Sequence, residues 1–529
     1  MPATVQRQSR DGTGHRVPRP TTGTPVPGSA AGLRDPRRLL AAVTGRAGRL
    51  RTRATGWTLA RLAAIGVACA AAWWAVGRYG RPYDFFDMKI YHGAMVWWTS
   101  GRDLYEFVAP HTTLGYTYPP FAALVMAPMA LVSAVTAGWV NLVLSLLALA
   151  MVLGWALGPL TDRYGWPRWF AVGLAVPLAA ATEPVRETLG YGQVNLLLLA
   201  LVYLDMVALQ HGWRRTTRRP GDGRDAGGGP DQTGSRWRSL PAVRLGYRLW
   251  TSGALAGVGV GLATAVKVTP ALFIGYFLVT RKWRAALTAL ATAAGATLVT
   301  FVVSGSATMR YFTSVVMDTS RVGTVDATAN QSLAGILARL YDSPTTPTLM
   351  WLAFSMLVLA VGLSRAATAH REGDELAAFA LVGLTANVIC PISWSHHLVF
   401  LIPALVVLVD AGLRRRAAAI GLGHRGMFSR GPGGVPALAG LRQLTAALGI
   451  YVLYVVSPIW RFEHRLPAVS HYADGLHGAL AENSLGLVLI ALVALLPWRP
   501  GAVPAFSPAH PTVRAVRTVP ATRPPVRPS

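Results

Sequence analysis

Long apolar stretches recur along most of this chain and limit what it can fold into. Windows of roughly 15 to 22 apolar residues repeat from residue 57 to residue 497, and the sequence is 52% hydrophobic but only 14% charged, with a mean hydropathy of +0.38. A soluble domain has about a quarter charged residues. The windows are long enough to cross a hydrocarbon core of about 30 Å and lack the period-2 alternation of barrel strands. We therefore expect an all-α polytopic membrane protein.

The apolar segments predict a bundle of about twelve transmembrane helices. They lie near 57–78, 120–135, 138–158, 168–182, 193–211, 252–266, 270–280, 284–304, 349–364, 375–391, 398–412, 443–458 and 478–497. Four of them lie between the loops 79–119 and 212–250, where the charge pattern described below requires an odd number of crossings. We expect 168–182, which is short and interrupted by Pro177, to be re-entrant, or two segments to form one broken helix.

The basic residues set the predicted orientation. The loop 212–250 has nine arginines against three aspartates, 413–442 has six with no acid, and the chain after Pro497 has five with no acid. We expect these parts, together with a disordered basic tail over 1–56 and a disordered tail over 498–529, to be cytoplasmic. The membrane domain is then 57–497, both termini are inside, and the charge-balanced loops 305–348 and 459–477 are outside.

Two other classes of function are disfavoured by composition and spacing. The net charge of +27 lies mostly in tails and loops, which fits the cytoplasmic bias of a plasma-membrane protein better than a nucleic-acid site. Cys69 and Cys390 lie in or at the ends of apolar segments and have no metal-ligand spacing. We expect no disulfide framework, no bound metal and no cofactor.

The first outside loop carries the candidate general base. Asp84, Asp87 and Tyr91 are spaced to share one face of a helix, and the Trp and Tyr content of this loop is typical of a segment at the membrane interface. A carboxylate at such a surface is partly desolvated and suited to proton abstraction. A helix cap followed by a solvated loop explains the same spacing, and both interpretations stay open.

Other polar groups fall on the same outer side. Gln193 and Asn195 follow 168–182, and Asn330 lies in 305–348. Lys267 stands between two apolar segments, where it either snorkels to the interface or meets a lipid phosphate. His396 and His397 point about 100° apart on a helix, so hydrogen bonds to a phosphate or a sugar, or an ordinary interfacial pair, fit better than a metal site.

Taken in order, these motifs resemble those of the actinobacterial polyprenyl-phosphate-mannose-dependent α-(1→2)-mannosyltransferases, glycosyltransferase family 87 of the GT-C superfamily. The resemblance covers roughly 57–497. It rests on Asp87-x-x-x-Tyr91 with Gly101-x-x-Leu104-Tyr105, Tyr118-Pro119-Pro120, Gly192-Gln193-Val194-Asn195, Lys267-Val268-Thr269-Pro270, Asn330-Gln331-Ser332 and Ser393-Trp394-Ser395-His396-His397.

The resemblance implies a GT-C bundle with an interfacial helical first outer loop and an inverting transfer on the outer face of the membrane. Mannose passes from a polyprenyl-phosphate donor to a glycolipid or lipoglycan acceptor. Asp87 is the implied catalytic residue, with Asp84 in reserve. The donor phosphate would meet Lys267, His396 and His397. The implied sugar or acceptor contacts are Tyr91, Tyr118, Gln193, Asn195 and Asn330.

Three alternatives remain open at this stage. A transporter or flippase for a polyprenyl-linked sugar should have ionisable groups near the bilayer midplane, where this sequence has almost none. A non-catalytic assembly subunit with a degenerate site is the second. The third is a GT-C enzyme that uses another lipid-linked sugar, such as arabinose. Neither the acceptor nor the oligomeric state is indicated by the sequence.

Overall fold

The computed structural model describes residues 36–217, 246–250, 252–318, 321–421 and 440–499. The chain divides into two compact units, Met1–Arg61 and Leu62–Ser529. The described part of the first unit is the start of helix α1, which runs Pro36–Tyr79. Every other element, and every residue of the site described below, belongs to the second unit.

The described residues form helices joined by turns and by longer loops. Up to the basic loop 212–250 these are α2 (Phe86–Thr99), η1 (Leu104–Glu106), α3 (Pro120–Met126), η2 (Ala127–Leu131), α4 (Ala134–Tyr164), α5 (Arg168–Ala180), α6 (Glu183–Tyr191) and α7 (Asn195–Thr217). After it come α9 (Val258–Val266), η4 (Thr269–Ala271), α10 (Leu272–Val279), α11 (Trp283–Val303), α12 (Gly305–Thr313), η5 (Val315–Met317) and α13 (Leu333–Leu340). The last are α14 (Thr348–Arg371), α15 (Glu375–Ile389), η7 (Ser395–Phe400), α16 (Leu401–Gly421), α17 (Leu441–Val456), η8 (Pro458–Arg461), α18 (Gly475–Glu482) and α19 (Ser484–Leu495).

Several of these helices are long and apolar enough to cross a membrane. Among the described residues five pass by length and composition: Thr55–Tyr79, Ala134–Tyr164, Trp283–Val303, Thr348–Arg371 and Ser395–Ala418. Two bent pairs, α6 with α7 and α18 with α19, bring the number to seven. Shorter apolar helices cover Pro120–Leu131, Arg168–Ala180, Thr269–Val279, Glu375–Ile389 and Leu441–Val456. The chain is a multi-pass membrane protein, and each apolar segment expected from the sequence contains helix, although 120–135 and 478–497 are each divided between successive helices and 252–257 is turn.

The structure adds two details to the expected organisation. Helix α1 begins at Pro36, so residues 36–56 are helical rather than part of a disordered tail. This stretch is rich in Ala, Leu and Arg, all good helix formers. The sharp break lies between α6 and α7, which meet at 116°, whereas 168–182 contains the single helix α5 with Pro177 inside it.

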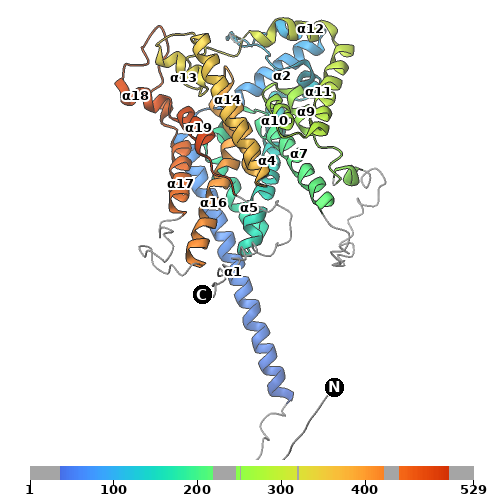
Figure 1. Ribbon diagram of the computed structural model, residues 1–529, viewed down its shortest axis with the longest axis vertical. Helices are drawn as coiled ribbons and strands as arrows, with labels where there is room; N and C mark the ends of the chain where they lie inside the picture. Colours follow the sequence, from blue (N-terminus) through green and yellow to red (C-terminus); the bar gives the residue numbers. More distant parts are fainter. Residues whose placement is uncertain (1–35, 218–245, 251, 319–320, 422–439, 500–529) are drawn as a thin grey trace, which may run out of the picture. The chain divides into compact units, whose positions relative to one another are not determined.

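A buried helix forms the centre of the second unit. All residues of α15 from Leu376 to Val388 are buried, and α15 packs against α14, α16, α10 and α19. Figure 1 shows α2, α12, α13 and α18 near one end of this unit, while the C-terminal parts of α7 and α16 extend toward the other. The side chains of the candidate site come from the first of these two ends and from the helix breaks beneath it.

Two hydrogen bonds hold α9 against α7 and so position Lys267. The Asp205 carboxylate of α7 accepts hydrogen bonds from the backbone N–H groups of Gly259 (3.1 Å) and Val260 (2.7 Å), which lie in the first turn of α9. A carboxylate at a helix N-terminus satisfies otherwise unpaired donors and favours the helix dipole. Because α9 ends at Val266 and Lys267 follows directly, this contact fixes the position of the lysine.

The close approach of α9 to α7 depends on a glycine. A Cβ atom added at Gly259 would lie 2.1 Å from the backbone oxygen of Leu201, whereas one added at Gly295 of α11 would meet nothing within 4 Å. We expect Gly259→Ala to lower the free energy of unfolding by about 1–3 kcal/mol, since overpacking forces the backbone apart. Gly295→Ala should be neutral or stabilise by up to about 1 kcal/mol. Thermal unfolding of the two purified variants in detergent measures this, and equal melting temperatures would contradict it.

Candidate active site

Helix α2 presents Asp87 and Tyr91 to the interior and leaves Asp84 outside. Asp84 and Phe85 have φ values of 44° and 50°, so the helix begins only at Phe86. The Asp84 side chain is 82% exposed and pairs with Lys89. Asp87 lies in the first turn, and Tyr91, one turn later, is buried. The expectation that all three share one helix face is therefore wrong for Asp84, because the left-handed backbone before α2 turns it away.

A directed chain of hydrogen bonds ends on Asp87. The Tyr91 hydroxyl donates to the Tyr118 hydroxyl (3.2 Å), and the Tyr118 hydroxyl donates to Gln193 Oε1 (2.8 Å). Gln193 Nε2 then donates to Asp87 Oδ2 (2.7 Å). Each donor points toward the carboxylate, and such chains polarise one another and stabilise negative charge at their end. Within the described residues no hydrogen bond reaches the other carboxylate oxygen, Oδ1.

Gln193 lies at the break between α6 and α7 and is held there through its backbone. The Asn141 amide of α4 donates to the Gln193 carbonyl oxygen (3.1 Å). Gly192 has a φ of 77°, and a Cβ there would come within 2.6 Å of the Met88 Cβ on α2. Glycine adopts this conformation without strain. The break and its glycine thus let Gln193 approach α2.

Asn195, the first residue of α7, joins two further segments. Lys267 Nζ donates to Asn195 Oδ1 (3.0 Å), and Asn195 Nδ2 donates to the backbone oxygen of His396 (2.9 Å). The Thr188 hydroxyl donates to the same oxygen (2.9 Å). Lys267 also lies over the Tyr118 ring, with Nζ 5.3 Å from its centroid. The structure therefore brings Lys267 and His396 to the residues around Asp87.

Of the two adjacent histidines His396 is buried and His397 is half-buried, and their rings are perpendicular. Their ring centroids are 4.6 Å apart at an interplanar angle of 90°. His396 Nδ1 lies 4.0 Å from the Glu187 carboxylate, and its Nε2 has no hydrogen-bond partner among the described residues. His397 Nδ1 accepts from the backbone N–H of Trp394 (3.2 Å). A buried nitrogen without a partner costs free energy unless a ligand completes it.

Burial shifts the pKa values of Asp87 and Lys267, the two charged groups of the site. Desolvation raises the pKa of Asp87 to about 6, against the opposing effects of the Gln193 hydrogen bond and the positive charge of Lys267. Desolvation lowers the pKa of Lys267 to about 8, and Asp87 is among the groups that oppose this shift. Near neutral pH the carboxylate is ionised and the ammonium is charged, and both are poorly solvated. Charged groups tuned in this way are typical of catalytic sites.

Asn330 is the one remaining candidate that does not join this group. Its amide nitrogen donates to the backbone oxygens of Val325 (2.8 Å) and Pro391 (3.1 Å), and its oxygen accepts from the Ser393 N–H (2.9 Å). The backbones of Asn330 and Trp394 also form an isolated antiparallel bridge. The side chain is fully buried and links the outer loop to the turn before His396.

Several polar residues that support the site have no role assigned from the sequence. Asn141, Thr188 and Ser395 hold Gln193, His396 and Glu187, respectively, and Glu187 is buried with one oxygen, Oε1, without a partner in the described residues. Glu187 lies with Glu183 and Arg186 in the short polar stretch between the apolar segments 168–182 and 193–211, and this cluster of charges is a usable signal. Asn141 and Thr188 occur in ordinary helical positions, and no local pattern distinguishes them.

The sequence matches known proteins over much of its length. The model of glycosyltransferase family 87 matches residues 116–391. A polyprenol-phosphate-mannose-dependent α-(1-2)-phosphatidylinositol mannoside mannosyltransferase from Mycobacterium tuberculosis is 31% identical over 384 residues, which cover 69% of this chain and 79% of that protein. A polyprenol-phosphate-mannose-dependent α-(1-2)-phosphatidylinositol pentamannoside mannosyltransferase from Mycolicibacterium smegmatis is 30% identical over 339 residues, 62% of this chain and 70% of that one.

One solved structure is also similar. It is ArnT from Cupriavidus metallidurans bound to undecaprenyl phosphate, with a TM-score of 0.31 and 17% identity over 84% of this chain and 77% of that one. The family assignment itself comes from the sequence matches, which span more than half of this chain and include Tyr118, Gln193, Asn195 and Lys267. On this basis the chain belongs to glycosyltransferase family 87.

Proposed function

We propose that this glycosyltransferase moves mannose from a polyprenyl-phosphate donor to a glycolipid or lipoglycan acceptor at the outer face of the plasma membrane. Asp87 Oδ1 takes the proton from an acceptor hydroxyl, whose oxygen forms a bond to the anomeric carbon. The bond between that carbon and the phosphate oxygen breaks, and its electron pair leaves with polyprenyl phosphate. A β-linked donor then yields an α-linked product, for which we infer an α-(1→2) linkage.

The single observation that carries this proposal is the environment of Asp87. The Gln193 chain bonds one carboxylate oxygen and leaves the other open. The partly desolvated carboxylate has its pKa raised to about 6, close to the pH at which a general base is most effective. Asp84, by contrast, is exposed and pairs with Lys89, away from the Gln193 chain.

The phosphate of the donor is assigned to the cationic side of the site. Lys267 supplies a fixed positive charge, and His396 and His397 supply hydrogen bonds. Tyr91, Tyr118, Gln193 and Asn195 connect this side with Asp87 through hydrogen bonds and the contact of Lys267 with the Tyr118 ring, and they would contact the sugar. For Asn330 we propose a positioning role, because its amide is already bonded to the backbone.

The proposed topology places the site outside and both termini in the cytoplasm. It also moves the non-crossing segment from 168–182 to 120–131. Helices α3 and η2 have seven and five residues, about 18 Å together at ~1.5 Å per residue, and η2 packs against the loop helix α2. The remaining segments then alternate across the membrane, with twelve crossings in the GT-C manner.

Two parts of this proposal rest on the relatives alone. Their names specify phosphatidylinositol mannosides as acceptors and mannose as the sugar. The acceptor assay should therefore include these glycolipids together with lipoglycan, and the donor assay should include lipid-linked arabinose beside lipid-linked mannose. Transfer of arabinose alone would reject mannose as the sugar and leave the base assignment intact.

We expect Asp87→Asn to abolish transfer of labelled mannose in membranes that contain the protein, with a loss of at least about 10²-fold, since general-base catalysis contributes that much. Asp84→Asn removes the other carboxylate of the same loop and should retain activity. Both proteins are assayed at equal abundance with polyprenyl-phosphate mannose and the glycolipid acceptors. Transfer that survives in Asp87→Asn would reject Asp87 as the base. Movement of the donor lipid across the bilayer without transfer would instead indicate a flippase.

The pH profile of kcat/KM should report the ionisation of Asp87. The base must be deprotonated, so activity should fall as the pH drops below about 6 and level off above it. Gln193→Leu removes a hydrogen bond that lowers this pKa, so its acid limb should move to higher pH. Asp84→Asn is the matched control and should keep the limb where it is. An acid limb that is the same in Gln193→Leu would argue against this coupling.

An alkaline limb should report Lys267. Its pKa is lowered to about 8, so the positive charge is lost as the pH rises above that value, and kcat/KM should fall there. Arginine stays charged throughout this range. Lys267→Arg should therefore lower kcat/KM but remove the alkaline limb. Lys267→Met should have a low kcat/KM at every pH. Persistence of the limb in Lys267→Arg would assign it to another group.

A further inference from the structure

A cavity lies apart from the residues around Asp87. Its volume is about 640 Å³, and it lies between α14, α16, α17 and α19. The helix Ser395–Ala418 is 24 residues long, about 36 Å at ~1.5 Å per residue. His396 is at its start, whereas Arg415, which lines the cavity, is near its end. The cavity therefore opens at the other end of the helix bundle from the candidate active site.

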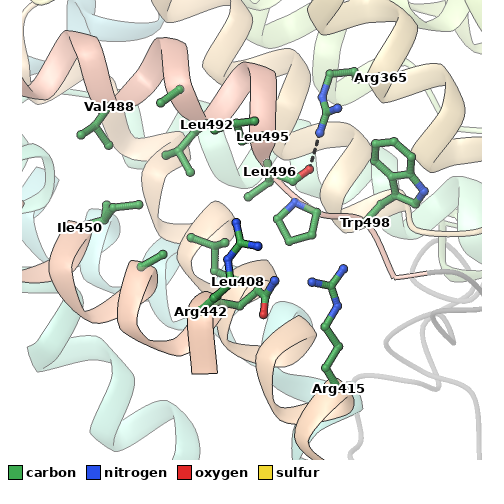
Figure 2. A pocket seen from close by; sticks show the side chains of 14 residues that line it. Arg365, Leu408, Arg415, Arg442, Ile450, Val488, Leu492, Leu495, Leu496 and Trp498 are labelled. Carbon is green, nitrogen blue, oxygen red and sulfur yellow. Dashed lines mark hydrogen bonds between the residues drawn. The ribbon is translucent and has the colours of Figure 1, made fainter. Parts of the chain in front are cut away.

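Three arginines from three helices line this cavity. Arg365 comes from α14, Arg415 from α16 and Arg442 from α17. Figure 2 shows their guanidinium groups directed toward the space beside Leu496. Arg415 and Arg442 are exposed, and among the described residues none of the three forms an ion pair. The lining residues include no Asp or Glu.

The Arg365 guanidinium is held in position, but one of its N–H donors has no hydrogen-bond partner among the described residues. Its Nη2 donates to the backbone oxygen of Leu496 (2.7 Å), and its guanidinium lies 5.0 Å from the centroid of the Trp498 ring. Its Nε is buried and has no hydrogen-bond partner in the part of the chain that is described. Buried donors are normally satisfied, so this atom points to a missing acceptor.

The nearby carboxylates cannot supply that acceptor. Asp374 accepts from Arg499 Nε (2.7 Å), and Asp410 accepts from Arg499 Nη1 (2.7 Å) and Arg414 Nε (2.9 Å). Both acids are buried and already paired. The adjoining segments 422–439 and 500–529 contain no Asp or Glu in their sequence. Among the described residues no free carboxylate lines the cavity, so an anionic group of another molecule can supply the acceptor that Arg365 Nε lacks.

The opposite wall of the cavity is apolar. Helices α17 and α19 contribute Ile450, Val488, Leu492 and Leu495, and the Leu495 side chain is 75% exposed. Trp498 stands at the edge, a position that tryptophan favours at a membrane interface. An occupant that suits both walls has an anionic head and hydrocarbon chains.

We propose that this cavity binds an anionic phospholipid of the bilayer. Its phosphodiester would lie among Arg365, Arg415 and Arg442, and its acyl chains would follow the groove between α17 and α19. Basic pockets between transmembrane helices recognise anionic head groups in this way. The proposal does not depend on the reaction assigned to the Asp87 site, because it involves none of the same residues.

The test uses the purified full-length protein in a neutral detergent. Native mass spectrometry counts bound phosphatidylglycerol, with phosphatidylcholine as the zwitterionic lipid and glycerol 3-phosphate as the soluble phosphate. The variant Arg415→Gln with Arg442→Gln removes two cavity charges. Its matched control, Arg281→Gln with Arg284→Gln, removes two exposed charges at the turn between α10 and α11. A third variant, Ala446→Trp, fills the cavity without changing its charge.

We expect phosphatidylglycerol to bind in preference to phosphatidylcholine and to raise the melting temperature. The Arg415/Arg442 variant should weaken this binding by roughly tenfold or more, and Ala446→Trp should weaken it as well. The Arg281/Arg284 control should bind as the unmodified protein does. Equal binding of both lipids, an equal loss in the control, or unchanged binding in both cavity variants would overturn the proposal. Displacement of the lipid by glycerol 3-phosphate at matched concentration would also overturn it, since that outcome indicates a simple anion site.

Discussion

Gln193 and Asn195 lie two residues apart at the 116° break between α6 and α7, and they reach in different directions. Gln193 extends to Asp87 on α2, while Asn195 binds Lys267 at the end of α9 and the backbone of His396 before α16. Four segments from distant parts of the chain thus meet at one interruption of a helix. A continuous helix would bond its own backbone groups here and bring these side chains no closer to α2. The rest of the site depends on this break.

The same arrangement keeps the two charges of the site apart. Asp87 accepts from Gln193, and Lys267 donates to Asn195, with no ion pair between Asp87 and Lys267 among the described residues. A direct pair would neutralise both groups, and a substrate would have to break it first. Instead, the neutral amide of Gln193 bonds to the Asp87 carboxylate and that of Asn195 bonds to the Lys267 ammonium. The carboxylate is left able to accept a proton, and the ammonium is left able to meet an anion, within a poorly solvated space where both effects are strong.

The sequence predicts the helices of this protein better than it predicts their breaks. Apolar length locates α4 or α14 because burial in lipid acts on every residue of a span. The turn of Asp84 away from the site depends on positive φ at two successive residues, which helical spacing does not reveal. The bond from Gln193 to Asp87 joins residues 106 positions apart, and only tertiary packing brings them together. For Asn330 the sequence motif is easy to find, but the structure shows that the amide bonds to the backbone and does not reach the group around Asp87.

The immediate surroundings of Asp87 and the network around Arg499 handle buried charge differently. Around Asp87 the polar groups are mostly tyrosines and amides, which bind a charge without cancelling it. Arg499, in contrast, pairs with both Asp374 and Asp410, and this network joins the residues after α19 to α15 and α16. Buried acids that are fully paired stabilise the position of that segment and have no free capacity for a ligand. The same pairing also places Leu496 and Trp498 beside Arg365. It thus shapes the arginine-lined cavity, but the arginines that line the cavity receive no carboxylate from it.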